Sequence, residues 1–432
     1  MIQTDSILQK NFFLLNPESK KNILKLSKNF FYLLLTNGTN LIIPIIIIPF
    51  LLSRLGIERF GLVMMAQALM TFLIIIPECL NIPGTQAVSV KRNNSAELEH
   101  IFNKVFASKL VLLLFSFMLL LIVVIVIPMF WQERTLYLFS FGMVVGKTLM
   151  PVWFLQGLEK MKYIVFANII AKAFLLIFIL KFINNTSAYL YVNLFYSFGD
   201  IVVGILGILF LKKISNIRFR FVSIRSIKQQ LLSSWHLFIS IIANSTYINS
   251  NILILGALTN NRVVGIYAVA EKAMLLLKQT AGIFLQATFP HACKLAEDSV
   301  VEFKNFLKKE LCLLFIMFSI AGALMYLFAK EICVFFTKKE ITQAIEYIKW
   351  LSPIPLIVAL NIPAYQALII KNEKKSFTTV ITSGALISIS LNFLLIPYLS
   401  TAGTIISIFV TEIFVTIGLH YALKYKHSHY TL

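Results

Sequence analysis

Charged residues are scarce in this 432-residue chain, and acidic residues are scarcer than basic ones. Only 13% of the residues are charged, with 19 Asp and Glu against 39 Lys and Arg, whereas 58% are hydrophobic and the mean hydropathy is +0.83. Apolar segments of about 20 residues, the length that crosses a bilayer as a helix, recur from end to end. The composition excludes a soluble protein and predicts a polytopic membrane protein.

Cysteine pairs and enzyme motifs are lacking. Four cysteines show no paired or CxxC spacing, so they offer no disulfide or metal framework: Cys79, Cys293, Cys312 and Cys333. The chain has no Walker loop, no HExxH motif and no nucleophile elbow. We therefore predict a protein that is not an enzyme, with no catalytic residue, metal or cofactor.

The formal net charge of +20 could suggest a nucleic-acid partner, but its distribution favours another reading. Lys and Arg fall in short clusters between the apolar segments, as topology signals do, and form no basic groove. We expect the partner to be the lipid bilayer and not a nucleic acid.

Twelve apolar segments are predicted to span the membrane. They are continuously apolar over about 20 residues and do not alternate over about 10, which favours helices over a membrane barrel. The segments lie near residues 29–52, 61–82, 102–127, 136–158, 163–182, 188–211, 231–258, 263–289, 311–328, 341–370, 377–396 and 403–423.

Basic residues also predict the orientation. With the N-terminus inside, 26 of the 39 Lys and Arg fall in cytoplasmic segments and 8 in outside loops. This bias predicts that both termini are cytoplasmic. The first residues show no short apolar core with a small-residue cleavage site, so we expect no cleaved signal peptide.

The chain is predicted to consist of two six-helix halves, residues 1–215 and 216–432. The longest basic connection, Lys212–Lys228, separates them. GLVMMAQALM (Gly61–Met70) matches GIYAVAEKAM (Gly265–Met274), and Gln156 followed by EKMK matches Gln366 followed by NEKK. Duplicated halves with a central cavity are typical of transporters.

Near the outer end of the tenth span, Lys349 is predicted to form a surface pair with Glu346. Four lysines lie deeper within predicted spans, where a cation is costly unless it faces protein, water or an anion. These are Lys147, Lys172, Lys272 and Lys278. We expect them to line a cavity, although the first three could form structural ion pairs and Lys278 could reach the cytoplasmic surface. Gly142 and Gly146 form a GxxxG pattern that predicts close helix contact near Lys147.

Four acidic residues are also predicted to be buried: Glu78, Asp200, Glu271 and Glu412. Asp200 and Glu412 occupy equivalent positions in the sixth and twelfth spans. Such carboxylates could carry a coupling ion, H⁺ or Na⁺, as access alternates, or they could simply balance the buried lysines. The sequence leaves both roles open.

Four segments in order resemble Wzx-type O-antigen flippases, the polysaccharide-transporter branch of the superfamily that includes the MATE exporters. They are NFFYLLLTNGTNLIIPIIIIPFLLSRLGIERFGL (29–62), PVWFLQGLEKMKY (151–163), GIYAVAEKAM (265–274) and YIKWLSPIPLIVALNIPAYQALIIKNEKK (347–375). The acidic residue that the family has late in the second helix is retained as Glu78.

The resemblance implies a MATE-like fold in the bacterial inner membrane. It also implies movement of undecaprenyl-diphosphate-linked oligosaccharides, O-antigen repeat units, from the cytoplasmic to the periplasmic leaflet, alongside other polysaccharide-assembly proteins. The four buried lysines would then bind the diphosphate. Trp153 and Tyr267 would be candidates for stacking on a sugar ring, and Gln156 would join them as a substrate-binding residue.

Three alternatives remain from the sequence. A MATE-type drug exporter predicts a cavity dominated by carboxylates and aromatic rings, against which the four lysines count. A glycan polymerase or ligase needs catalytic groups outside, where Arg54, Arg59 and Arg262 are the only candidates and the longest loop has about a dozen residues. A non-transporting scaffold would tolerate loss of every buried charge.

Overall fold

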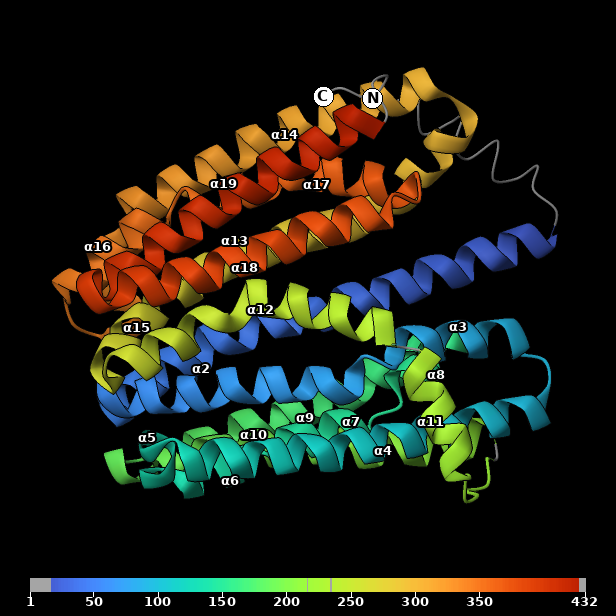
Figure 1. Ribbon diagram of the computed structural model, residues 1–432, viewed down its shortest axis with the longest axis horizontal. Coiled ribbons are helices and arrows are strands. Elements are labelled where there is room, and N and C mark those ends of the chain that lie inside the picture. Colours follow the sequence, from blue (N-terminus) through green and yellow to red (C-terminus); the bar gives the residue numbers. More distant parts are fainter. Residues whose placement is uncertain (1–16, 216, 234, 427–432) are drawn as a thin grey trace.

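The computed structural model describes residues 17–215, 217–233 and 235–426, and within these ranges the chain forms helices and no strand. The elements fall into two groups joined by a short helix, α11 (Ile224–Ser233) (Figure 1). We call the first group the N-terminal bundle: α2 (Pro17–Glu78), α3 (Asn81–Lys91), α4 (Ser95–Val126), α5 (Pro128–Gln132), α6 (Arg134–Ser140), α7 (Gly142–Leu149), α8 (Val152–Gly157), α9 (Met161–Phe182), the 3₁₀ helix η1 (Thr186–Ala188) and α10 (Tyr189–Ser215). The second group is the C-terminal bundle: α12 (Trp235–Leu258), α13 (Asn261–Asp298), α14 (Val300–Leu327), α15 (Ala329–Thr337), α16 (Thr342–Leu351), α17 (Ile354–Ile370), α18 (Lys374–Leu399) and α19 (Thr401–Lys426).

Helix α2 consists of two arms that reverse direction at Gly56. This residue has φ 74° and ψ 169°, a conformation that residues with a Cβ rarely adopt. Figure 1 shows the first arm running to one end of the molecule and the second arm returning from it. The arms correspond to the first two predicted spans.

Nine helical stretches among the described residues are long and apolar enough to cross a membrane. One of them, Leu41–Lys91, contains the reversal at Gly56 and so covers two predicted spans. Helices α12 and α13 lie where the seventh and eighth spans were predicted, but neither is among the nine. The all-helical membrane fold is confirmed, and the exact count of twelve crossings stays a prediction.

The fourth predicted span is interrupted, unlike the single helix expected from the sequence. It comprises α6, α7 and α8, and the main break lies at Met150, whose φ of −69° and ψ of 115° are extended. The residue before a proline is biased away from the helical region, and Pro151 follows. The break ends α7 at Leu149, two residues after Lys147.

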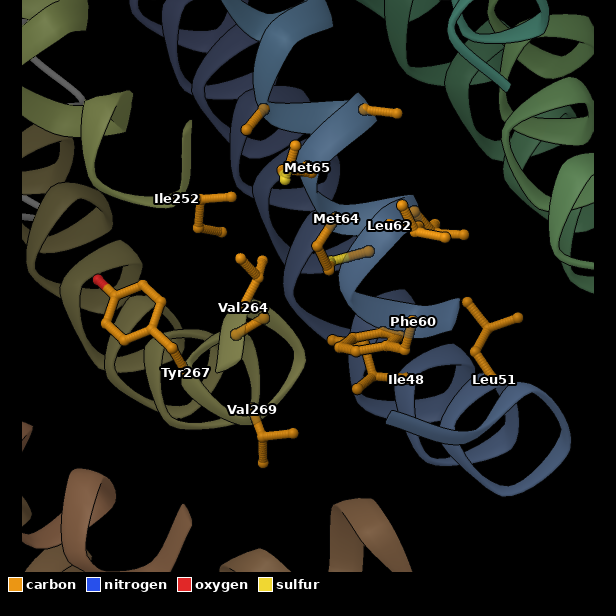
Figure 2. Packing of buried hydrophobic residues seen from close by; sticks show 14 of the residues in the cluster. Ile48, Leu51, Phe60, Leu62, Met64, Met65, Ile252, Val264, Tyr267 and Val269 are labelled. Atoms are coloured by element: carbon orange, nitrogen blue, oxygen red, sulfur yellow. The ribbon is translucent and has the colours of Figure 1, made fainter. Parts of the chain in front are cut away.

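The two bundles contact each other near one end of the molecule, where α2 packs against α12 and α13. Figure 2 shows buried apolar side chains of these three helices gathered into one cluster. Two glycines allow the close approach: a Cβ on Gly61 would overlap the carbonyl oxygen of Asn261, and one on Gly265 would overlap that of Ile57. The bundles are therefore in backbone contact at this end.

The opposite end carries the basic connections. The α3–α4 turn, with Lys91 and Arg92, and helix α11, with Arg225 and Lys228, lie at the end where α2 begins and α19 ends (Figure 1). These two basic segments lie at the same end of the bundles, and the side of the membrane that this end faces stays a prediction.

Candidate functional site

The clearest charged pair in the N-terminal bundle joins α7 to α10. The Lys147 ammonium lies 3.4 Å from Asp200 Oδ1, with 41% and 22% of the two side chains exposed. Both residues line a cavity, so part of the exposed area of each side chain faces that cavity. The sequence left a structural ion pair open as one alternative for Lys147, and that ion pair is present.

Glycines in α7 and α10 place this pair. A Cβ on Gly146 would overlap the backbone of Asp200, one on Gly142 would press on Ser197, and one on Gly204 would press on Leu149. The close contact predicted from the GxxxG pattern is confirmed. Because the backbones nearly touch, the short Asp200 side chain reaches the ammonium of the residue that follows Gly146.

The cavity has a volume of about 410 Å³ and is bounded by α7, α8, α9 and α10. Its polar lining comes from six side chains: Lys147, Gln156, Asn168, Lys172, Tyr196 and Asp200. The sequence placed the buried lysines at the interface of two halves, whereas this cavity lies within the N-terminal bundle. It brings together Lys147, Gln156 and Lys172, which were predicted to bind substrate, with Asp200, which was predicted to take part in ion coupling.

Lys172 is the cation that the cavity leaves uncompensated. Within the described part of the chain its ammonium makes no hydrogen bond and no ion pair, although it interacts electrostatically with Lys147 and Asp200. Two ammonium groups therefore face one carboxylate in this space. A cavity with this charge balance favours an anionic ligand.

Glu78, at the end of α2, interacts electrostatically with Lys147 and with Lys109 of α4. Lys109 is fully buried and donates a 3.0 Å hydrogen bond to Asn81 Oδ1. The predicted orientation includes this lysine in the 26 cytoplasmic basic residues, as the last of the cluster Lys91–Lys109, so it was not among the buried lysines expected from the sequence. The available signal was its position inside the third apolar segment.

In the C-terminal bundle, Lys278 of α13 pairs with Glu412 of α19 at 2.9 Å. The exposed fractions of the two side chains are only 17% and 4%. The pair lies beside Glu271 and Asn251 around a space of about 20 Å³, enough for roughly one water molecule. This second pair is closed and has no room for a sugar or a phosphate.

Both predicted aromatic candidates are fully buried. Trp153 stacks on Phe102 at 5.8 Å and meets Phe154 edge-on at 5.6 Å, in a core on the far side of α8 from the cavity lining. Tyr267 donates a 3.1 Å hydrogen bond to Glu271 Oε1. Neither ring lines the described cavities, so neither has a face open to a sugar here.

Lys272 is half-buried on α13 and lines neither cavity. The predicted site residues are thus divided between an open group in the N-terminal bundle and a closed group in the C-terminal bundle. The structure also reveals a buried acid that the sequence analysis missed, Glu310 of α14, which is hydrogen-bonded to Thr288 and Gln366.

Comparison with known families and proteins gives a consistent result. Residues 26–296 match the model of a family described as polysaccharide biosynthesis protein. A putative O-antigen transporter of Escherichia coli (strain K12) is 26% identical over 398 residues, which cover 91% of this chain and 96% of that protein. A putative O-antigen transporter of Shigella dysenteriae is also 26% identical, over 92% of this chain and 100% of its own length.

Solved structures show the same fold. An inward-facing multidrug resistance MATE family transporter of the MOP superfamily superposes with a TM-score of 0.72 at 15% identity, covering 91% of this chain and 95% of that one. The lipid II flippase MurJ in an inward closed conformation superposes with a TM-score of 0.70 at 12% identity, covering 93% and 87%. The predicted MATE-like architecture is confirmed.

Proposed function

Because the chain belongs to the polysaccharide biosynthesis protein family, we propose that it moves undecaprenyl-diphosphate-linked oligosaccharide repeat units across the bacterial inner membrane. Movement runs from the cytoplasmic to the periplasmic leaflet. The relatives named as putative O-antigen transporters, which this chain matches over nearly their whole length, support this proposal.

The observation that carries the proposal is the cavity with two ammonium groups and one carboxylate. A diphosphate cannot cross hydrocarbon unaccompanied, since transfer of a charge to the bilayer centre costs several kcal/mol or more. Lys147 and Lys172 offer two flexible point charges at the depth of the apolar spans, and lysine binds a passing phosphate without a rigid clamp. A volume of about 410 Å³ is within the usual range for a ligand pocket.

Binding would rearrange the charges in the cavity. The diphosphate first meets Lys172, which has no carboxylate partner, and then competes with Asp200 for the ammonium of Lys147. Release of Asp200 leaves a carboxylate free to take up a coupling ion. Gln156 and Asn168 offer hydrogen bonds to the sugars next to the diphosphate.

Alternating access follows from the arrangement of the bundles. We place both termini and the basic end in the cytoplasm, with six spans in each half. The bundles meet at the other end through α2, α12 and α13, so the conformation described here is closed toward the periplasm. Rocking of the bundles about this contact would expose the site to each side in turn.

The test is complementation of a flippase-null strain with Lys147→Ala, Lys172→Ala and the double variant. We expect at least a ten-fold loss of surface glycan in the double variant, with undecaprenyl-linked repeat units accumulating inside the cell. Lys172→Arg, which keeps the charge, should retain more activity than Lys172→Ala.

The matched control is Lys181→Ala, at the exposed end of the same helix, α9, where the ammonium lies over the Phe182 ring. This variant should behave as wild type. Undiminished surface glycan in the double variant, at normal expression, would overturn the proposal and favour a MATE-type exporter of cations or a scaffold.

A further inference from the structure

Glu310 is buried in the C-terminal bundle between three helices. Its Oε1 atom accepts hydrogen bonds from the Thr288 hydroxyl of α13 at 2.8 Å and from Gln366 Nε2 of α17 at 3.0 Å. Gln366 Nε2 also donates to Thr288 Oγ1 at 2.7 Å. Only 3% of Glu310 and 0% of Gln366 are exposed. The cluster is separate from the Lys147–Asp200 cavity and from the Lys278–Glu412 pair.

Two atoms of this cluster lack partners. Glu310 Oε2 and Gln366 Oε1 are both buried, and neither has a hydrogen-bond partner among the described residues. Both atoms are acceptors if the carboxyl group is ionised, so they cannot satisfy each other. Leaving a buried polar atom unpaired costs about 1–3 kcal/mol, and more when it carries charge.

One proton resolves this conflict. A protonated carboxyl group carries an O–H donor, and a primary amide carries the complementary acceptor. An acid and an amide can therefore pair through two hydrogen bonds, N–H to the acid carbonyl and O–H to the amide carbonyl. The first of these is the Gln366 Nε2 to Glu310 Oε1 bond already described, and the second would join the two unpartnered oxygens.

The surroundings also disfavour an ionised Glu310. No basic side chain of the described residues lies within 4.0 Å of its carboxyl oxygens, whereas Asp200 and Glu412 each have a lysine at this range. The titratable groups near it in sequence on the elements packed around it are His291, Cys293 and Lys294 of α13, Lys308, Lys309 and Cys312 of α14, and Tyr365 and Lys371 at α17, while α15 and α16 carry Lys330, Glu331, Glu346 and Lys349. His291 contacts the ring of Phe306, one turn before Glu310, and Lys349 lies over Tyr326.

We propose that Glu310, Thr288 and Gln366 form a proton-binding site, occupied in the conformation described here, through which proton movement is coupled to the proposed transport. The coupling half of this inference rests on the proposed function; the proton site itself does not. Asp200 and Glu412, two of the four acids that the sequence offered for coupling, are paired with lysines, whereas Glu310 can gain or lose a proton without breaking an ion pair. A shift of α13, α14 and α17 relative to one another would move the Gln366 amide away from Glu310. The carboxyl group would then release its proton.

A metal cation fits this cluster less well. Hard cations such as Ca²⁺ and Mg²⁺ take about six or more oxygen ligands. The cluster offers two unpartnered oxygens and one hydroxyl, and Gln366 directs an N–H group into it. A proton needs only the two oxygens.

The first experiment is infrared difference spectroscopy on the purified full-length protein in lipid at neutral pH. We expect the C=O stretch of a protonated carboxylic acid, lost in Glu310→Gln and shifted in Gln366→Leu, which removes the acid's acceptor. Glu302→Gln, at the exposed first turn of α14, should leave the band unchanged and is the matched control. A band that survives Glu310→Gln in folded protein, or that disappears when K⁺ is replaced by Na⁺, would overturn the proton site.

The second experiment measures translocation of a lipid-linked oligosaccharide in vesicles with and without an imposed pH gradient. Wild type and Glu302→Gln should be accelerated by the gradient, and Glu310→Gln should lose this acceleration. Equal acceleration of Glu310→Gln would refute the coupling. If wild type translocates nothing while the infrared band still depends on Glu310, the proposed function fails and the proton site stands.

Discussion

Gly265 of α13 lies directly against the carbonyl oxygen of Ile57 in α2, so the two bundles touch through backbone atoms. Gly61 of α2 makes the reciprocal contact with Asn261 at the start of α13. Each contact has no space for a Cβ. The closed end of the molecule depends on this pair of glycines.

Gly265→Val is expected to separate the bundles at that end, because its side chain would overlap the Ile57 carbonyl group. Spin labels at Arg54 and Arg262, both exposed there, should report a longer distance in the variant. The control is Gly282→Val on the same helix, where a Cβ meets nothing within 4 Å. An unchanged distance in folded Gly265→Val protein would contradict this account of the closed end.

Breaking the Lys147–Asp200 pair should destabilise the protein unless both charges are removed. Lys147→Met and Asp200→Asn each leave one member of the pair without the other, whereas the double variant removes both charges of the pair. A double-mutant cycle of thermal melting in detergent should give a favourable coupling energy of about 0.5–3 kcal/mol. The double variant should melt near wild type yet fail in complementation, which separates stability from transport. Strict additivity of the two single changes would show that the pair contributes nothing.

Amine-reactive labelling should distinguish the two bundles. Lys172 and Lys147 line a cavity of about 410 Å³, whereas Lys278 faces a space of about 20 Å³ and is paired with Glu412. Mass spectrometry of the labelled protein should find Lys172 modified much faster than Lys278, with the exposed Lys181 as the reference. Pyrophosphate should protect Lys172 and leave Lys181 unaffected. Faster modification of Lys278 than of Lys172 would reverse our assignment of the open site.

Trp153→Ala is expected to lower stability and not substrate affinity. The ring is fully buried against Phe102 and Phe154, and loss of a buried large aromatic side chain costs about 3–5 kcal/mol. Gly84→Val should have a similar effect, because a Cβ there would meet the Trp153 ring. Thermal melting tests both variants. A Trp153→Ala protein that melts normally but transports less glycan would contradict this prediction and support sugar stacking by Trp153.

Helix positions could be predicted because they follow from the length of apolar runs. The predicted segments lie where the described residues form helices, although 136–158 is divided among α6, α7 and α8 and 341–370 between α16 and α17. The Gly142–Gly146 spacing correctly indicated a close contact. Which charges meet could not be predicted, since a helix that is apolar all round does not reveal the direction of its one polar residue. Lys147 meets an acid of α10, and Lys278 meets an acid of α19. The two acids lie at equivalent positions of the predicted repeat, but the two lysines come from the fourth and the eighth spans, which are not equivalent.

The repeated EKMK and NEKK motifs illustrate the same limit. Glu159 and Asn372 both have positive φ, 58° and 62°, and the next residue donates to a carbonyl five positions back in each case, Lys160 to Leu155 and Glu373 to Leu368. These matching helix ends align Gln156 with Ile369, one turn beyond Gln366. The backbone match was readable from the sequence, but the glutamine match was not: one side chain lines a cavity and the other is buried against Glu310.

The break at Pro151 gives Lys147 a second property. Proline has no N–H group, so the carbonyl oxygen of Lys147, four residues earlier, lacks the amide donor that a continuous helix would supply. The last turn of α7 therefore presents a cationic side chain and a backbone acceptor from one residue. A ligand that carries both phosphate oxygens and hydroxyl groups is the kind that can use both at once.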